Sequence, residues 1–472
     1  MSDTLKELLT KVVDQDYCIG CGVCASITNS PLVMDLDKDG KYKPVFKKKE
    51  EDFSSNIDIN SVCPFADQSK NETELGEKLF SYNEGVKFNE HSGYFLKNYA
   101  AYVKEGEFRE KGSSGGMGNW LANKLLELNL VDAIIHVSST DDKEKSPEVL
   151  FEYRVSSSLA ELEKGAKSKY YPIEMSKVIN HVKQNDLRYA IIGIPCFIKS
   201  IRLLSSQDLL INERIKYTIG LVCGHLKSDM FAKSIGWQLG IYPEELTEID
   251  FRKKNEDGLA FQYGVEVKGS QNNKTVVKSA PTNNLYTTNW GHGLFKYNAC
   301  EFCDDVLAET ADVTVGDARI PEYEKDGKGT NIVVTRHPVF QEIIDKYRSE
   351  LFLNELTEKQ IYQSQAGGFR HRREGLSYRL YLKDQNNEWR PVKRIKASNQ
   401  VNRKRKKIYE KRNVLLHESF KAYKLAVKEN DFNTFIDYME PIIKDYNKTA
   451  APSLTRRILR KAKREVKDLL KK

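Results

Sequence analysis

The feature that most constrains this chain is a run of three cysteines, spaced every third residue, near its N-terminus. The segment YCIGCGVCAS places thiols at Cys18, Cys21 and Cys24. Thiolates at this spacing can each bind one iron of a cubane cluster, and the fourth iron then takes a distant cysteine, often one followed by proline. Cys63, followed by Pro64 in SVCPF, fits that role. The pattern predicts a [4Fe–4S] cluster bound by these four cysteines.

The segment between the third and the fourth of these cysteines is predicted to be a β-hairpin. Alternating apolar residues flank Asp39 and Gly40, and this pattern favours a tight turn between two short strands. Gly20 and Gly22, which lie between the cysteines, allow the backbone to approach a cluster closely. Cysteine loop and hairpin together are typical of a ferredoxin-type module. Zinc is the alternative, although zinc sites usually pair two Cys-x-x-Cys knuckles.

Four further cysteines occur later in the chain and could converge on a second metal site: Cys196, Cys223, Cys300 and Cys303. The first two follow predicted buried strands over 190–194 and 217–222, and functional groups in α/β domains gather at the carboxyl ends of strands. The other two precede a predicted strand that ends at Gly316 and Asp317. The spacing leaves three alternatives open: a second cluster, half of a zinc knuckle, or buried core cysteines.

A glycine- and serine-rich loop, GSSGG at 112–116, precedes a predicted helix over 117–130 and a predicted strand over 132–137. Free N–H groups and the positive end of the helix dipole at such a loop can bind a phosphate or an anionic flavin ring. A flexible turn with an N-cap serine is the alternative. The loop does not match G-x-x-x-x-G-K-[ST], so ATP binding is not predicted.

The composition is that of a globular protein, with 40% hydrophobic and 10% aromatic residues in 472. That length is enough for two or three domains. No segment reaches the ~18 uninterrupted apolar residues of a membrane helix, and the N-terminus has no apolar signal core. We therefore expect a cytoplasmic protein, in which cysteines serve as metal ligands, a catalytic thiol or core residues rather than in disulfides.

Taken together, these motifs resemble the coenzyme F420 hydrogenase/dehydrogenase beta-subunit family, which includes 7-hydroxymethyl chlorophyll a reductase. The segments that carry the resemblance run from Cys18 to about Arg336. They are CIGCGVC with CPF, GSSGGMGNWLANKLLE, KSKYYP, IIGIPCFIKSIRLL, GLVCGHLKS, DFRKK, CEFCDDVLAETADVTVGDA and DGKGTNIVVTR.

The resemblance implies an iron–sulfur flavoprotein oxidoreductase. A flavin, FAD in characterised members with FMN left open, would lie beside one or two [4Fe–4S] clusters, the second held by the four later cysteines. Ferredoxin or a partner subunit would exchange single electrons with the chain, and coenzyme F420 is not required. The implied flavin contacts are Ser113, Ser114, Gly115, Gly116, Ser168, Lys169, Tyr170, Arg252 and Lys253.

The chain departs from the family pattern in two places. It reads Gly193-Ile194-Pro195-Cys196 where the family often has G-T-P-C, and Lys167-Ser168-Lys169-Tyr170 where it often has G-S-K-Y. The cysteine and the second lysine remain, so the departures put in doubt a hydroxyl contact and not the class of cofactor.

Two residues are candidate catalytic groups. A positive Lys169 would stabilise a reduced flavin, and His225, which follows Cys223 and Gly224, could donate a proton. The alternative for His225 is a loop histidine that is hydrogen-bonded to the backbone. Asp317 could orient a ligand or be an ordinary turn residue.

The predicted fold is of the α+β or α/β class in three parts: a ferredoxin-like 4Fe-4S module over 1–75, a mixed α/β flavin domain over 76–345, and a basic, mainly helical region over 346–472. The segment 453–472 has nine lysines and arginines against Glu465 and Asp468, and its apolar residues recur at helical spacing. Such a helix could be an ordinary solvated terminus, lie on an anionic membrane at the inner surface, dock an acidic partner such as ferredoxin, or bind nucleic acid loosely.

Three functions remain open. The first is an enzyme in which flavin and [4Fe–4S] clusters couple one-electron transfer from ferredoxin, or another partner, to two-electron chemistry on an organic substrate or a deazaflavin-like cofactor. A sugar or lipid-linked sugar from surface-polysaccharide biosynthesis is a substrate hypothesis. The second is a non-catalytic electron-transfer subunit of a larger redox complex. The third, a zinc-stabilised structural or nucleic-acid-binding protein, is favoured only by the basic tail.

Overall fold

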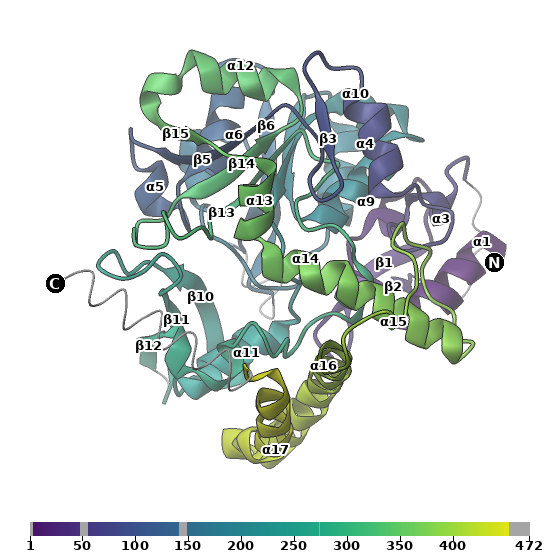
Figure 1. The fold of residues 1–472 in the computed structure, drawn as a ribbon, viewed down its shortest axis with the longest axis vertical. Helices are drawn as coiled ribbons and strands as arrows, with labels where there is room; N and C mark the ends of the chain where they lie inside the picture. Colours follow the sequence, from purple (N-terminus) through teal and green to yellow (C-terminus); the bar gives the residue numbers. More distant parts are fainter. Residues whose placement is uncertain (1–2, 48–54, 141–148, 273, 453–472) are drawn as a thin grey trace. The chain divides into compact units, whose positions relative to one another are not determined.

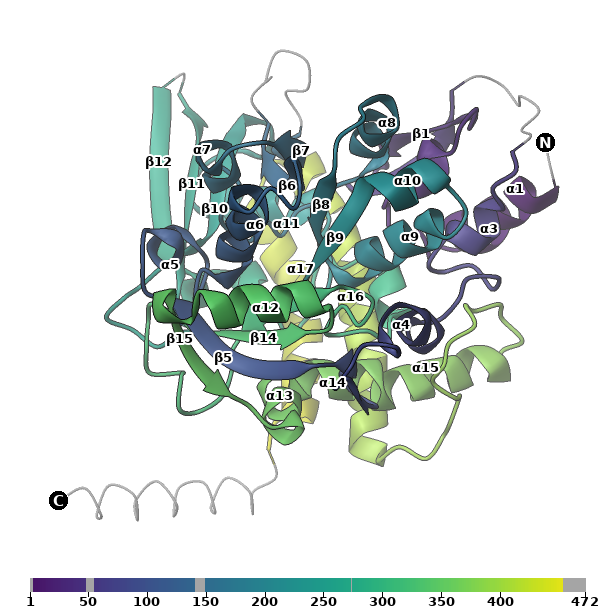
Figure 2. The same cartoon turned by 90° about the horizontal axis from the view of Figure 1, so that it is seen from above.

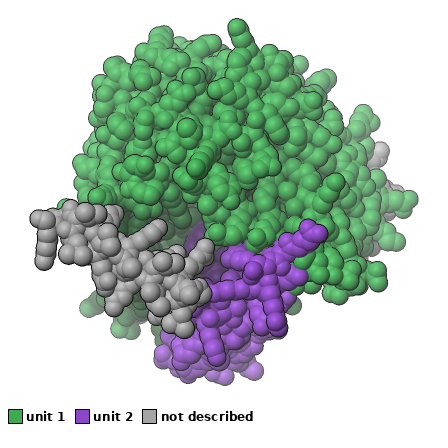
Figure 3. Space-filling model, in the orientation of Figure 1, with its two compact units in different colours: residues 1–289, 295–399 green, residues 290–294, 400–472 purple. Residues whose placement is uncertain are grey.

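The computed structural model describes residues 3–47, 55–140, 149–272 and 274–452. The chain divides into two compact units (Figure 3). The first comprises Met1–Asn289 and Phe295–Asn399, and the second comprises Trp290–Leu294 and Gln400–Lys472. All eight cysteines belong to the first unit.

The first unit is built on a mixed eight-stranded sheet with the strand order β15-β5-β14-β13-β9-β8-β6-β7. β6, β8, β9 and β13 are parallel neighbours, and the four outer strands pair antiparallel (Figure 2). The strands are β5 (Lys97–Val103), β6 (Ala133–Ser139), β7 (Phe151–Ser156), β8 (Tyr189–Gly193), β9 (Ile215–Leu221), β13 (Val313–Asp317), β14 (Asn331–Thr335) and β15 (Leu351–Glu355). A large mixed sheet confirms the predicted mixed α/β class.

Helices cover both faces of this sheet, which explains why its central strands are apolar in continuous runs. In β14, Val333 packs in one core cluster with residues of α6 (Met117–Glu127) and α12 (Pro338–Lys346). Ile332 and Val334 pack in another cluster with residues of α13 (Glu358–Ser364) and α14 (Ala366–Arg372). Successive residues of a strand point to opposite faces, so β14 supplies both cores; the helices that contribute to them, α6, α12, α13 and α14, are labelled in Figure 1.

The N-terminal segment forms short elements around a hairpin. These are α1 (Asp3–Glu7), a π-helical segment (Leu8–Val13), α2 (Val23–Ser26), β1 (Leu32–Leu36), β2 (Tyr42–Phe46), α3 (Ile59–Val62) and α4 (Glu72–Phe80). β1 and β2 pair antiparallel, and the turn between them closes with the Gly40 N–H donating to the Asp37 carbonyl at 2.9 Å. The predicted hairpin at Asp39 and Gly40 is confirmed.

Further elements surround this framework. β3 (Lys87–Asn89) and β4 (Gly93–Phe95) form a small hairpin, and β10 (Leu246–Lys253), β11 (Gly264–Gln271) and β12 (Lys274–Pro281) form an antiparallel sheet. The other helices of this unit are α5 (Phe108–Lys111), α7 (Leu159–Glu163), α8 (Ser176–Gln184), α9 (Pro195–Ser205), α10 (Leu209–Arg214), α11 (Asp229–Gln238) and α15 (Glu374–Gln385), with a 3₁₀ turn at Asn298–Phe302.

The second unit contains two long helices, α16 (Arg403–Glu429) and α17 (Phe432–Ala450). Asn430, in the left-handed conformation with φ 54°, ends α16, and the Asp431 side chain accepts the Asn433 N–H to begin α17. The predicted helical character of the C-terminal region is confirmed. The predicted helix over 453–472 lies outside the described residues, and the boundaries at 75 and 345 stay predictions. Within the described ranges, every helix is too short or too polar to cross a membrane.

Candidate functional site

The first cysteine set, Cys18, Cys21, Cys24 and Cys63, gathers around the short helices α2 and α3. Cys24 lies within α2, and Cys63 is the C-terminal cap of α3. Burial raises the pKa of the Cys24 thiol well above its usual range, and the three neighbouring thiols raise it further. Burial also raises the pKa values of Cys21 and Cys63 to about 12. The four thiols therefore lie within electrostatic range of one another.

Two glycines hold the loop of this set in place. The Gly20 N–H donates to the Cys18 sulfur at 3.3 Å. Gly20 has φ +73°, and a Cβ there would lie 2.7 Å from the Tyr42 carbonyl oxygen on β2. Gly22 has φ +82°, and a Cβ there would meet the Glu174 carboxylate at 2.5 Å. Only glycine fits both positions, and the result is a loop that turns N–H groups toward sulfur.

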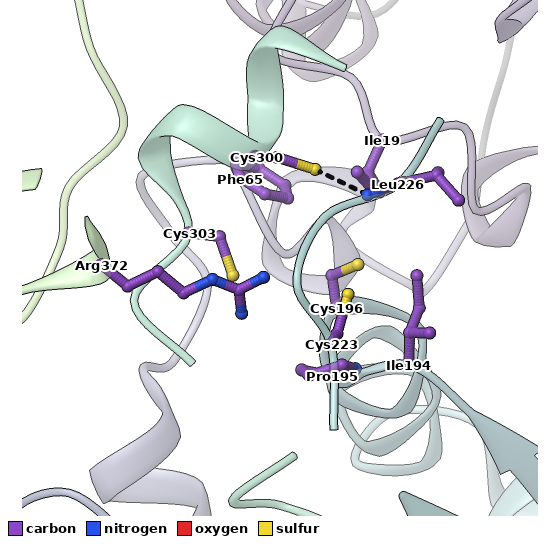
Figure 4. A pocket seen from close by; sticks show the side chains of 10 residues that line it. All are labelled: Ile19, Phe65, Ile194, Pro195, Cys196, Cys223, Leu226, Cys300, Cys303 and Arg372. Carbon is purple, nitrogen blue, oxygen red and sulfur yellow. Dashed lines mark hydrogen bonds between the residues drawn. The ribbon is translucent and has the colours of Figure 1, made fainter. Parts of the chain in front are cut away.

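The second cysteine set, Cys196, Cys223, Cys300 and Cys303, lines one pocket (Figure 4). Cys196 is the second residue of α9, directly after β8, and Cys223 follows β9. β8 and β9 are parallel neighbours, so these cysteines lie at the same edge of the sheet. Cys300 belongs to the 3₁₀ turn and Cys303 follows it. The four later cysteines converge, and their role as metal ligands stays a prediction.

The pKa of Cys196 depends on the other cysteines of the second set and on one cysteine of the first set. Burial raises the pKa of Cys196 well above its usual range, and Cys303, Cys223, Cys300 and Cys21 add to the rise. The Leu226 N–H donates to the Cys300 sulfur at 3.3 Å, shown as the dashed line in Figure 4. Because Cys21 belongs to the first set, the two sets are adjacent.

The space between the two sets is filled by apolar and aromatic side chains. Ile19 and Phe65, which belong to the loops of the first set, line the pocket of the second. Tyr153 on β7 is buried, and its pKa is raised first by burial and then by Cys196 and Cys21. Its hydroxyl donates to the Ile192 carbonyl oxygen at 3.2 Å. One side chain thus lies near a cysteine of each set.

Arg372 is a residue of this site that the sequence did not reveal. It ends α14, is 2% exposed and lines the pocket of the second set. Its Nη2 donates to the Gly224 carbonyl oxygen at 2.8 Å. Its charge lowers the pKa values of Cys223, Cys300 and Cys303, although burial keeps all three raised overall. In the sequence it stands in the basic run FRHRR, which looks like a solvated helix face.

The donor chemistry of both sets fits an iron–sulfur cluster. Each set offers four thiols, one buried and three half-buried, with an N–H group donating to one sulfur of each set, as cluster ligands require. Within the described ranges, no three His, Cys, Asp or Glu side chains are grouped as ligands of a single metal ion. In a cluster each thiolate binds its own iron, so the ligands surround a core of several atoms.

Several of the predicted flavin contacts come together at the carboxyl end of β13. Arg252 forms an ion pair with Asp317 at 3.0 Å, and its Nη2 donates to the Ser113 carbonyl oxygen at 3.2 Å. Its Nη1 lies 3.4 Å from the Tyr170 hydroxyl. The Ser168 N–H donates to the Ser113 hydroxyl at 2.8 Å. The structure therefore joins the three predicted segments around one arginine.

Two lysines complete what we call the cationic group, which consists of Lys169, Arg252 and Lys254. Burial lowers the pKa of Lys169 to about 8. Burial, together with Arg109, lowers that of Lys254 to about 8, and its ammonium donates to the Ser114 carbonyl oxygen at 2.9 Å. Lys253 instead pairs with Glu266 at 2.5 Å, where both side chains are exposed. Neighbouring residues of a strand point in opposite directions. Because Lys254 lies two residues after Arg252, this alternation could have favoured Lys254 over Lys253.

The remaining predicted residues occupy distinct places. A Cβ at Gly115 would lie 2.7 Å from the Ala101 carbonyl oxygen, and one at Gly116 would lie 2.6 Å from the backbone of Phe108. Close packing thus accounts for both glycines, and anion binding by their loop stays a prediction. The Ser114 hydroxyl donates to the Thr330 carbonyl oxygen at 3.1 Å. His225 is buried in the loop between Cys223 and Leu226, by the second cysteine set.

The known proteins that this chain resembles form two groups, one with short matches and one with long matches. A ferredoxin of Thermococcus litoralis is 46% identical over 52 residues, which are 11% of this chain and 81% of that protein. A ferredoxin of Pyrobaculum islandicum is 37% identical over 59 residues, or 12% of this chain and 50% of that protein. These matches fit the short N-terminal module with its tandem cysteines.

Two longer matches each cover more than half of this chain. An uncharacterised protein of Methanocaldococcus jannaschii is 24% identical over 251 residues, which are 53% of this chain and 80% of that protein. A chain in a structure of the F420-reducing [NiFe] hydrogenase complex from Methanosarcina barkeri is 15% identical, with a TM-score of 0.47 over 65% of this chain and 98% of that chain.

Two family models decide the relationship. The N-terminal model of the coenzyme F420 hydrogenase/dehydrogenase beta subunit matches residues 98–180. The C-terminal model of the same subunit matches residues 186–359, which include the whole second cysteine set. Together they span more than half of the sequence, which confirms the resemblance found in its motifs: the chain belongs to the coenzyme F420 hydrogenase/dehydrogenase beta-subunit family.

Proposed function

We propose that this chain is an iron–sulfur electron-transfer subunit of the hydrogenase or dehydrogenase type, with a [4Fe–4S] cluster in each cysteine set. The observation that carries the proposal is the adjacency of the two cysteine sets, because Ile19 and Phe65, from the loops of the first set, line the pocket of the second. Membership of the family and the ferredoxin-like segment support it.

The residues of the chain would perform three tasks in this function. The four thiols of each set would bind the irons, and the N–H groups of Gly20 and Leu226 would stabilise the negative charge on sulfur. Ile19 and Phe65 would exclude water from the space between the sets. When bound, the clusters would carry single electrons.

The electron donor or acceptor would be a ferredoxin or another subunit. Clusters exchange one electron at a time, so a partner that also carries single electrons suits them. The chain would then link that partner to a separate catalytic subunit. Reconstitution with purified candidate proteins would identify the electron donor or acceptor and the catalytic subunit.

A second candidate function, a flavin-dependent reductase, is favoured by the cationic group. Two half-buried lysines with lowered pKa values lie beside the Ser113 loop, and a phosphate of FAD or FMN would compensate their charge. A bound flavin would supply two-electron chemistry. Lys169 would then hold positive charge near the reduced ring, with His225 as candidate proton donor. The substrate would be an organic molecule such as a deazaflavin or a sugar derivative.

Anaerobic purification followed by iron, sulfide, zinc and flavin analysis tests both functions. About eight irons and eight sulfides per chain, four of each for every four-cysteine set, are expected for two clusters. Zinc in place of iron would overturn the proposal. Turnover of an organic substrate by the isolated, flavin-loaded chain with reduced ferredoxin would favour the reductase, and electron transfer without such turnover would favour the subunit.

A further inference from the structure

The guanidinium of Arg372 reaches into the pocket of the second cysteine set from α14. Figure 4 shows it extending from the helix toward the sulfurs. Its Nη2 is held by the Gly224 carbonyl, and its Nη1 is buried without a hydrogen-bond partner among the described residues. Among those residues it also has no carboxylate within ion-pair distance, so its charge faces the cysteines.

Other buried arginines nearby are neutralised by carboxylates. Arg379 pairs with Glu301 at 2.9 Å, and Arg394 pairs with Glu309 at 2.6 Å. A buried charge without a counter-charge is strongly destabilising. Arg372 therefore needs an anion in the pocket, and four thiolates around a cluster would provide one.

The aspartates next to the second cysteine set already have partners of their own. Asp304 pairs with Arg394 at 3.3 Å. Asp305 accepts the N–H groups of Leu307 and Glu309, each at 2.9 Å. Among the described residues that line the pocket, Arg372 is thus the cation, and it has no carboxylate partner of its own.

We propose that Arg372 is the charge-compensating residue of the second cysteine set, and that its positive charge raises the reduction potential of the cluster bound there. The inference rests on the proposed function. Reduction adds one electron, supplied by the external donor, and breaks no bond. A nearby buried cation stabilises the more negative, reduced form more than the oxidised form, and local charge is one of the factors that set cluster potentials.

Three variants of the full chain test this role: Arg372→Gln removes the charge, Arg372→Lys keeps it, and Arg370→Gln removes an exposed charge from the same helix. Iron and sulfide are measured first. A redox titration followed by electron paramagnetic resonance then gives the potentials. The same titration of a Cys63→Ser variant, which lacks one ligand of the first set, assigns the signals.

We expect Arg372→Gln to shift the electron-transfer equilibrium of the second cluster at least tenfold toward the oxidised form, which is about 59 mV for one electron. Arg372→Lys should keep most of the original potential, and Arg370→Gln should change neither cluster. A Gln variant with full iron and an unchanged potential overturns the proposal.

If Arg372→Gln loses the iron of the second set, the Arg372→Lys variant shows whether the lost charge is the cause. Full iron in Arg372→Lys supports charge compensation, whereas loss of iron there as well overturns it, because the charge was retained. A wild-type chain without any cluster signal would mean instead that the proposed function has failed.

Discussion

The two cysteine sets each bring four thiols together, but by opposite routes. The first is local: three of its members lie within seven residues, and short helices and a hairpin hold them. The second is assembled from three segments that only the sheet brings together, at the ends of β8 and β9 and on a 3₁₀ turn before β13. A local set depends on backbone conformation, whereas an assembled set depends on long-range packing and buried charge.

The largest effect is expected from removing one ligand of each set. Cys63→Ser should lose about half of the iron, and Cys300→Ser should lose the other half, because a cluster with three ligands assembles poorly. Iron and sulfide analysis of the two variants, purified side by side without oxygen, measures this. If Cys300→Ser keeps its full iron and sulfide, the second set does not bind a cluster and the comparison fails.

The dependence of the second set on buried charge can be tested at Glu301, which lies between Cys300 and Cys303. This carboxylate is 1% exposed and pairs with Arg379 at 2.9 Å, with Lys296, and with His371 at 3.4 Å. Glu301→Gln should lower the free energy of unfolding by about 3–5 kcal/mol, because it leaves buried cations without a partner.

Chemical denaturation measures the loss, and iron analysis should show that the second set is emptied first. A suitable control is Glu355→Gln, whose pair with Lys97 is exposed on both sides and should contribute at most about 1 kcal/mol. Equal losses in the two variants would contradict the role of the buried network.

The dependence of the first set on backbone conformation can be tested at Gly20. Gly20→Ala places a side chain at φ +73° and against the Tyr42 carbonyl, so it should cost about 1–3 kcal/mol and release iron from the first set. Gly118→Ala on α6 is the matched control, because nothing lies within 4 Å of its added Cβ. That change should be neutral or stabilise the helix by up to about 1 kcal/mol. Retention of both clusters in Gly20→Ala would show that the loop tolerates the side chain.

The smallest effect concerns the two lysines of the cationic group, whose pKa values lie near 8. Lys169 and Lys254 have pKa values lowered by burial to about 8, so both are largely protonated at pH 7. A bound anion favours the protonated form. Affinity for FMN or FAD should therefore fall above pH 8, by up to about tenfold per pH unit for each lysine.

Flavin fluorescence titrations at pH 7 and pH 9.5 measure this change, and Lys169→Met should weaken its pH dependence. The lowered lysine pKa values also make the free energy of unfolding depend on pH. Between about 8 and the usual lysine value of 10.5 the unfolded chain binds more protons, so the free energy of unfolding of the flavin-free protein should rise with pH in that interval. Equal affinity at both pH values would remove Lys169 and Lys254 from the flavin site.

Much of this arrangement was predictable where the signal is local. The apolar runs of β8 and β9 and the turn at Gly40 predicted their elements to within about two residues. The ends were less accurate: the helix predicted over 117–130 ends at Glu127, because Asn129 adopts φ 53°. Pro195 suits the first turn of a helix, so α9 begins there and Cys196 lies inside it.

The rest required the tertiary structure. Arg372 lies far along the chain from every cysteine it faces, and nothing in its own segment distinguishes it from the exposed Arg370. Lys253 and Lys254 are adjacent in the sequence; alternation along a strand predicts that they point in opposite directions, but only the packed structure shows that Lys253 pairs with Glu266 and Lys254 donates to the Ser114 carbonyl. Burial of a charge depends on what packs over it, which a single sequence does not state.

One consequence follows from the wall that Ile19 and Phe65 contribute to the pocket of the second set. The N-terminal segment thus supplies part of that wall, and a chain shortened by removing it would lose Ile19 and Phe65 and leave the second set more open to water. The integrity of the second set therefore depends on a segment that lies far from it in the sequence.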